Sequence, residues 1–149
     1  MSAFVVRPVT AAETRPLRQR ILRPQQSVED LVYPHDYAVD TLHAAAFADG
    51  ALVGTATVHP EAMPDGSAAY AWRIRGMATV PEMRRMGCGA ALVQACIDHA
   101  AARSGLVVWC NARTSASAFY AALGFVAEGH EFELPGIGPH YVMTKRLAR

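Results

Sequence analysis

Two arginines and two glycines lie together where a strand-like run gives way to a helical pattern, in the segment Arg84-Arg85-Met86-Gly87-Cys88-Gly89-Ala90. The first N–H groups of a helix lack partners within the helix, and with the positive end of the helix dipole they form an anion-binding site. The two glycines let the backbone approach a bulky diphosphate, and the two arginines place positive charge beside it. The spacing therefore predicts a site for a ligand that contains a pyrophosphate.

Other phosphate-binding motifs do not match this segment. A dinucleotide fingerprint needs a third glycine where this chain has Leu92. A P-loop needs a lysine followed by serine or threonine, and the segment contains no lysine. The alternative interpretation is structural, because two glycines also occur where a strand simply ends and a helix begins.

A second group able to do chemistry is the phenol of Tyr120, in the run Ala118-Phe119-Tyr120-Ala121-Ala122-Leu123-Gly124-Phe125. A phenol is protonated at neutral pH and can donate a hydrogen bond or a proton. Tyr120 also shares a helix face with Ala116 and Leu123. A core aromatic residue is therefore the alternative to a catalytic one at this position.

The surrounding pattern predicts the elements that position these groups. Asp49-Gly50 joins two apolar runs and suits a type I′ hairpin turn, since glycine accepts a positive φ. Thr10 and Glu13 form a capping-box signature for a helix that Pro16 either kinks or delays to about Thr14. We expect further helices over 87–103 and 115–123, strands over about 4–6, 41–48, 51–59, 69–80, 106–110, 125–134 and 141–147, and loops over 25–40 and 135–139.

This order of elements predicts the fold class. Strands dominate, and the second half of the chain contains a strand-helix-strand-helix unit, so we expect an α/β (α+β) protein with a mixed sheet and helices on its faces. The 149 residues fit one domain spanning residues 1–149, and no repeat or linker divides them.

Composition argues against several classes of protein. The chain is 52% hydrophobic and 18% charged, and it contains no apolar run near the roughly 20 residues of a membrane span. The first nine residues, interrupted by Arg7 and Pro8, do not suit a signal peptide, so we expect a cytoplasmic protein without a membrane partner. A net charge of +1 gives no long-range field for nucleic acid. The dispersed arginines at 15, 18, 20 and 23 are interpreted as the solvated face of a helix.

The cysteines do not predict a metal site. Cys88, Cys96 and Cys110 are an odd set without a CxxC pair. None of them stands at zinc-finger spacing from a second cysteine or a histidine. We therefore expect neither a disulfide nor a metal cofactor.

The two motifs resemble those of a known family. Arg84-x-x-Gly87-x-Gly89-Ala90, preceded by a strand with Pro81-Glu82, is similar to the arginine/glutamine-x-x-glycine-x-glycine/alanine motif of the GNAT superfamily of N-acetyltransferases. The run with Phe119-Tyr120 that ends in Leu-Gly-Phe, about 30 residues later, resembles that family's second signature. The resemblance covers residues 69–127. It implies a GNAT-like, mostly antiparallel mixed sheet of about six to seven strands with splayed central strands, flanked by about four helices.

The resemblance implies acetyl-CoA as co-substrate, with its pyrophosphate on the segment from Arg84 to Ala90. In the family, the pantetheine arm pairs like an extra strand with the strand ahead of that segment. The asparagine that usually stands about seven residues before the family tyrosine is replaced here by Arg113, and Asn111 lies two residues earlier. The coenzyme-binding residues implied in this chain are Met77, Ala78, Thr79, Val80, Arg84, Arg85, Met86, Gly87, Cys88, Gly89, Ala90, Asn111 and Phe119.

The resemblance also implies the chemistry, in which a neutral primary amine attacks the thioester directly in a ternary complex and a proton reaches the departing thiolate. It makes Tyr120 the general acid toward the coenzyme sulfur. The family often places a glutamate on the strand that reads Trp72-Arg73-Ile74-Arg75 here, without a carboxylate. We expect His140, just after Pro139 in the loop between the last two strands, to act as the base, through water, because an imidazole titrates near neutral pH. His59 and Glu61 are the alternatives.

The expected acceptor is an amine on a small molecule or a protein N-terminus or lysine. By resemblance, its pocket forms from about 25–40 and 133–141. A non-catalytic acyl-CoA-binding or sensory module is the alternative function, and the presence of Tyr120 favours catalysis. A homodimer is compatible with the resemblance, and the oligomeric state stays open.

Overall fold

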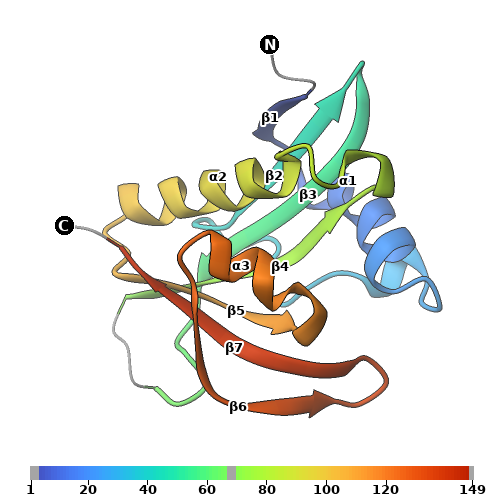
Figure 1. Ribbon diagram of the computed structural model, residues 1–149. Coiled ribbons are helices and arrows are strands. Elements are labelled where there is room, and N and C mark those ends of the chain that lie inside the picture. The colour runs from blue at the N-terminus through green and yellow to red at the C-terminus, as the bar shows by residue number, and fades with distance from the viewer. Residues whose placement is uncertain (1–3, 67–69, 148–149) are drawn as a thin grey trace.

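The computed structural model describes residues 4–66 and 70–147, in which seven strands form one sheet in the order β1-β2-β3-β4-β5-β7-β6 (Figure 1). The β4–β5 pair is parallel and the other neighbours are antiparallel. The mixed, mostly antiparallel sheet is therefore confirmed. The strands are β1 (Val5–Pro8), β2 (Leu42–Ala48), β3 (Ala51–Pro60), β4 (Ala71–Thr79), β5 (Val107–Arg113), β6 (Val126–Leu134) and β7 (Gly138–Arg146).

Three α-helices flank the sheet in the described residues, where we expected about four helices. The remaining helical segments are one π-helical turn and three short 3-10 turns. The α-helices are α1 (Ala11–Leu17), α2 (Cys88–Ala102) and α3 (Ser117–Ala122), the π-turn is Arg18–Leu22, and the 3-10 turns are Val28–Asp30, Pro81–Met83 and Thr114–Ala116. No helix in the described ranges is long and apolar enough to cross a membrane.

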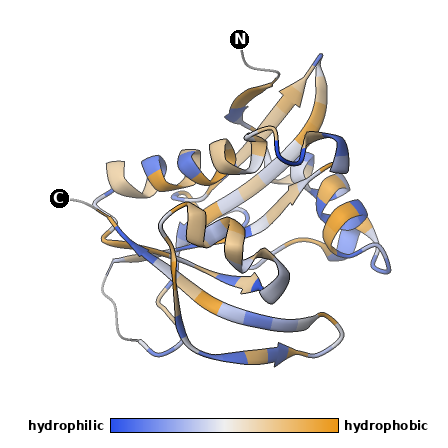
Figure 2. Cartoon of the chain, in the orientation of Figure 1, coloured by the Kyte–Doolittle hydropathy of each residue, from blue (hydrophilic) through white to orange (hydrophobic). Residues whose placement is uncertain are grey.

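Helix α2 packs against the middle of the sheet and shields most of its core. Its buried side includes Leu92, Val93 and Cys96, which recur at the spacing of an amphipathic helix. Figure 2 shows apolar and polar residues alternating around this helix, whereas the outer strand β6 is largely hydrophilic. The core therefore lies between α2 and the central strands, and the β6 edge is mostly exposed.

Two local predictions are confirmed at the start of the chain. The Thr10 hydroxyl accepts a hydrogen bond from the Glu13 N–H, and the Glu13 carboxylate accepts one from the Thr10 N–H, which completes the capping box. Pro16 lies in the last turn of α1, and the chain continues as the π-turn. The β2–β3 turn has Asp49 at φ 50° and Gly50 at φ 80°, the two positive angles that a type I′ turn requires.

The interpretation of Arg18 as solvated is wrong. Its side chain is fully buried in the π-turn and forms a two-pronged ion pair with Asp36, at 2.7 and 3.1 Å. It also donates to the Leu31 carbonyl and to the Thr57 hydroxyl of β3. Helical periodicity could not reveal this, because the partners lie 13 to 39 residues away along the chain.

The position expected for His140 is also wrong. Strand β7 begins at Gly138, so the loop after β6 is shorter than we expected and His140 lies inside the strand. It stands opposite Arg113 of β5 on one side and Phe132 of β6 on the other. Pro139 did not delay the strand, because it is the second residue of β7 and β5 pairs with β7 only from His140 onward, which leaves one side of Pro139 without a strand partner in the described residues.

The central strands diverge. β4 and β5 pair only at Ala71–Arg73 and Val107–Trp109, although β4 continues to Thr79 and β5 to Arg113. The register of β4 against β3 also shifts near Gly76, which adopts a positive φ of 66°. A Cβ on Gly76 would lie 3.1 Å from the Arg18 side chain, so glycine is needed there both for its backbone angle and for space. The splayed central strands are thus confirmed, and beyond Arg73 the β5-facing edge of β4 has no strand partner among residues 4–66 and 70–147.

Candidate active site

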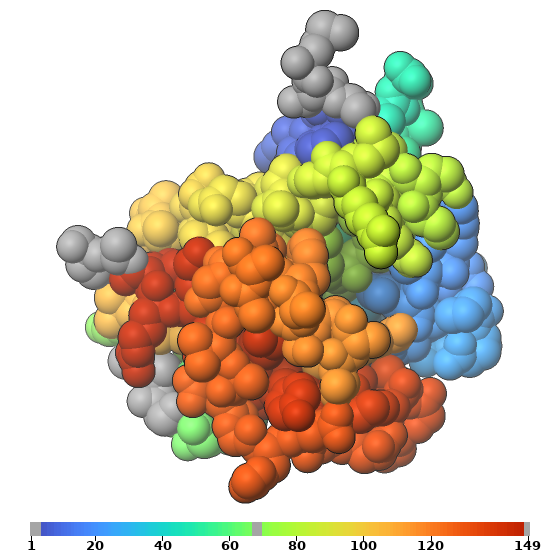
Figure 3. All heavy atoms as spheres, viewed as in Figure 1, coloured from blue at the N-terminus to red at the C-terminus, as the bar shows by residue number. Residues whose placement is uncertain are grey.

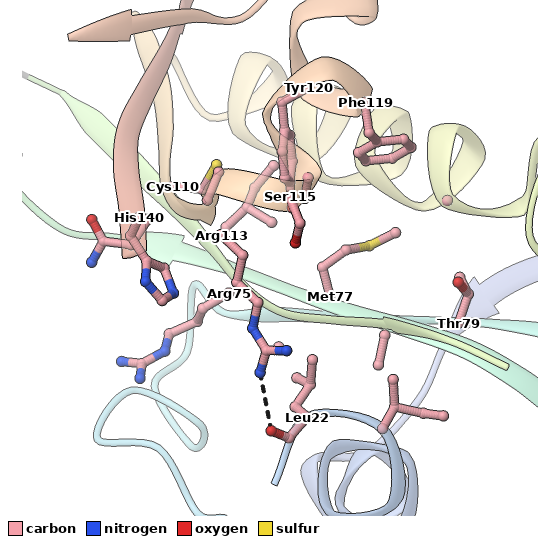
Figure 4. A pocket seen from close by; sticks show the side chains of 18 of the residues that line it. Leu22, Arg75, Met77, Thr79, Cys110, Arg113, Ser115, Phe119, Tyr120 and His140 are labelled. Carbon is pink, nitrogen blue, oxygen red and sulfur yellow. Dashed lines mark hydrogen bonds between the residues drawn. The ribbon is translucent and has the colours of Figure 1, made fainter. Parts of the chain in front are cut away.

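The divergence of β4 and β5 opens a cavity of about 1050 Å³. Its walls come from these two strands, the loop after β4, α3, the π-turn and β7. Figure 4 shows Arg75, Met77 and Thr79 following one another along β4, with Tyr120 pointing into the cavity above them. The cavity therefore runs along an unpaired strand edge from an arginine-lined end to the loop before α2.

The loop before α2 has the features of an anion cradle. Gly87 adopts a left-handed conformation with φ 84°, and Arg85 before it has φ 66°. The first helical hydrogen bond runs from the Ala91 N–H to the Gly87 carbonyl, so the N–H groups of residues 88–90 precede the ladder. Arg84 and Arg85 are exposed beside them. In Figure 3 this yellow-green loop faces the orange α3 region across a hollow in the surface. The arrangement can hold a diphosphate.

The structure brings most of the sequence-predicted set to this cavity. Val80 and Cys88 are buried in the core, Met86 is half exposed, and Gly87 and Ala90 lie at the start of α2. None of these five residues lines the cavity. The predicted residues that do line it are Met77, Ala78, Thr79, Arg84, Arg85, Gly89, Asn111, Phe119, Tyr120 and His140.

Two features of the walls fit a pantetheine arm. Asn111 Oδ1 is buried at the cavity wall without a hydrogen-bond partner in the described part of the chain. Such an acceptor is costly unless a donor such as an amide N–H reaches it. At Gly89, a Cβ would lie 3.0 Å from Met77 Cε and 3.1 Å from Phe119 Cζ, so glycine lets these two side chains close against the start of α2. The departure at Arg113 therefore still leaves an asparagine in reach of the cavity.

Tyr120 is both a packed aromatic residue and a cavity residue. Its side chain is 6% exposed, and its ring makes edge-on contacts with Phe119 and Phe125 at centroid distances of 5.0 and 5.4 Å. Burial, followed by the neighbouring thiols of Cys110 and Cys96, raises the pKa of the Tyr120 phenol well above its ordinary value. The phenol is therefore protonated at neutral pH and can donate at the cavity.

His140 lines the arginine-rich end of the cavity. Its Nδ1 lies 2.8 Å from the Gly138 carbonyl, which fixes the tautomer with Nδ1–H donating and Nε2 free to accept. Its β5 partner is Arg113, whereas Cys110 beside Tyr120 stands opposite Met143. Three residues of strand separate the two positions by ~10 Å. A water-mediated path from an amine near Tyr120 to His140 fits this spacing.

Three further arginines of the cavity were not predicted as site residues: Arg73, Arg75 and Arg113. Arg73 lies 3.0 Å from the Glu61 carboxylate, and Arg113 donates to the Leu22 carbonyl. Arg75 lies over the Tyr33 ring at 4.1 Å. The available signal was the alternation Arg73-Ile74-Arg75, because residues two apart in a strand share a face.

A cluster of titratable side chains lies next to Arg73 and consists of His35, His59 and Glu61. The two imidazole rings are stacked, with centroids 4.1 Å apart and planes within 10° of parallel. Lone pairs in parallel ring planes do not converge on one ion, and the Glu61 carboxylate already binds Arg73. We therefore interpret the cluster as a support for Arg73. Burial lowers the pKa of His59 to about 4, so this imidazole is neutral at physiological pH.

Comparison with known proteins agrees with this geometry. A family model described as acetyltransferase (GNAT) domain matches residues 16–147. An uncharacterized N-acetyltransferase, YitI of Bacillus subtilis, is 41% identical over 143 residues, which cover 95% of each chain.

Among solved structures, Escherichia coli ElaA superposes with a TM-score of 0.76 at 17% identity, over 95% of this chain and 99% of that one. An aminoglycoside 6'-N-acetyltransferase complexed with coenzyme A superposes with a TM-score of 0.74 at 15% identity, over 97% and 98% of the two chains. These two similarities concern the fold alone.

Proposed function

The chain belongs to the GNAT family of acetyltransferases, and from this premise we propose that it transfers the acetyl group of acetyl-CoA to a primary amine by direct attack in a ternary complex. The observation that carries the proposal is the cavity between the splayed strands, which joins an anion cradle, an unpaired strand edge and a protonated phenol. Acetyl-CoA would supply the activated acetyl thioester.

The cradle and the strand edge would bind and orient the coenzyme. The N–H groups of residues 88–90 and the side chains of Arg84 and Arg85 would hold the pyrophosphate. Backbone groups of residues 77–80 on the free edge of β4 would pair with the pantetheine amides. Asn111 Oδ1, which lacks a donor, would accept one further amide N–H.

Two side chains would move protons. Tyr120 lies where β5 and α3 meet the cavity, and it would give its phenolic proton to the coenzyme sulfur. Its raised pKa keeps the phenol protonated at neutral pH, so that it can donate a hydrogen bond to the developing thiolate. His140 Nε2 would take the proton of the amine through water.

The proposal is tested by thiol release. Purified protein with acetyl-CoA and a panel of amines and peptide N-termini should release free thiol, and Tyr120→Phe should lower kcat by roughly 10²-fold or more with nearly unchanged coenzyme affinity. Full activity of Tyr120→Phe across pH would remove the general-acid role. Coenzyme binding without thiol release from any amine would instead favour a non-catalytic acyl-CoA-binding module.

A further inference from the structure

The arginine and acidic side chains around the cavity are unequal in number, with an excess of positive charge. Six arginines line it in the described part of the chain, and none of the lining residues is an aspartate or a glutamate. Arg84 and Arg85 belong to the anion cradle beyond Thr79. The other four line the cavity on β4, on β5 and just after the π-turn, where the proposed function leaves room for the acceptor: Arg23, Arg73, Arg75 and Arg113.

Most of these four side chains have partners inside the protein. Arg73 is neutralised by Glu61 at 3.0 Å. Arg113 donates to the Leu22 carbonyl at 3.1 Å, and Arg23 donates to the same carbonyl at 2.8 Å. Carbonyl oxygens satisfy donors but do not neutralise charge, so two of these guanidinium groups remain as net positive charge beside the cavity.

Arg75 is the least compensated of the four. Its Nε is buried without a hydrogen-bond partner, and no carboxylate of the described residues forms an ion pair with it. Its guanidinium lies on the face of Tyr33, and that ring also carries Arg18 at 3.8 Å. Arg18 is already paired with Asp36, whereas Arg75 is not paired with an anion. A partly buried cation with unused donors is unfavourable until an anion reaches it.

The position of Arg75 fits a small ligand that spans the two ends. Arg75 lies two residues before Met77 on β4, and only Gly76 at the register shift separates it from the point where the proposed coenzyme arm begins. A guanidinium fork binds carboxylate or phosphate oxygens through two parallel hydrogen bonds. An amine whose other end carries such an oxyanion would reach Arg75 while its nitrogen faces the thioester.

Building on the proposed function, we infer that the acceptor is a small amine that also carries an oxyanion, and that Arg75 binds the oxyanion. Carboxylate and phosphate share this chemistry, and the substrate panel distinguishes them. A polycationic amine such as a polyamine is disfavoured, because it would bring like charges beside the arginines of this end.

Matched amines test the inference. Glycine and β-alanine are compared with their amides, O-phosphoethanolamine with ethanolamine, and spermidine serves as the polycation. We expect kcat/KM for at least one anionic member to exceed that of its neutral partner by about tenfold or more. A preference for the neutral members or for spermidine would overturn the inference and leave the proposed function intact.

Variants assign the preference to Arg75. Arg75→Gln should lower kcat/KM about tenfold for the anionic acceptor, mainly through KM, and leave the neutral amine within about twofold. Arg75→Lys, which keeps the charge, should retain part of the preference. Arg20→Gln removes the same charge from an exposed position outside the cavity and should behave as wild type. An unchanged preference in Arg75→Gln would also overturn the inference.

A binding measurement covers the case in which no amine of the panel reacts. Protein saturated with coenzyme A is titrated with N-acetylglycine and with N-acetylglycinamide, which mimic an anionic and a neutral product. Tighter binding of N-acetylglycine to wild type than to Arg75→Gln supports the inference, and equal binding of both compounds overturns it. Absence of coenzyme A binding itself would be a failure of the proposed function, which is a separate result.

Discussion

Acidification should destabilise the protein through one buried histidine. His59 is 1% exposed, and burial lowers its pKa to about 4 from the ordinary value of 6.5. Between these two values the unfolded chain binds a proton at this position and the folded chain does not, so stability falls as the pH falls. Between pH 7 and pH 5 the loss in the free energy of unfolding is about 2 kcal/mol, and below pH 4 it levels off at about 3 kcal/mol.

Urea unfolding at pH 7 and pH 5 measures this loss. Other groups titrate as well, so the quantity of interest is the difference between wild type and His59→Gln. Between pH 7 and pH 5, the free energy of unfolding of wild type should fall by about 2 kcal/mol more than that of His59→Gln. His130→Gln, at an exposed position, is the matched control and should show no such shift. Parallel pH profiles for wild type and His59→Gln would show that His59 binds its proton equally well in the folded and the unfolded chain, contrary to this prediction.

Three further variants probe the support of the fold and the coenzyme site. Asp36→Asn leaves Arg18 buried without its anion and should cost about 3–5 kcal/mol in urea unfolding, whereas removing both charges together with apolar residues should cost less. Gly89→Ala brings a Cβ to 3.1 Å from Phe119 and should weaken coenzyme A binding by calorimetry about fivefold, or ~1 kcal/mol, with little change in the midpoint of thermal unfolding. Asn111→Leu removes the unpaired acceptor and should weaken coenzyme A binding by ~1 kcal/mol, while pantetheine-free analogues such as ADP keep their affinity.

Local signals account for the part of the fold that the sequence predicts well. The capping box of Thr10 and the Asp49-Gly50 turn each depend on residues within a few positions, and both form as expected. The glycine spacing at 87 and 89 likewise identifies the cradle before α2, because helix ends impose the same backbone requirements in any protein. Elements and turns of this kind can be predicted from the chain alone.

Long-range partners account for what the sequence does not reveal. The sequence around Arg18 is typical of an exposed helix face. Only its hydrogen bonds with Asp36 and Thr57 in the folded chain show that it is buried. Arg75 lacks an anionic partner because Glu61 pairs with Arg73. The spacing of these residues along the chain does not reveal which arginine Glu61 contacts. His140 was expected in a loop, and pairing with both β5 and β6 extends the strand over Pro139.

In the proposed function, a diphosphate-bearing thioester binds along β4 with its phosphates at the start of α2. Calorimetric titration of the purified protein with coenzyme A and, separately, with pantetheine tests it most directly. We predict saturable binding of one coenzyme A per chain and binding of pantetheine at least tenfold weaker, since pantetheine cannot use the cradle. Equal affinity for the two ligands, or no heat with coenzyme A, would contradict the account.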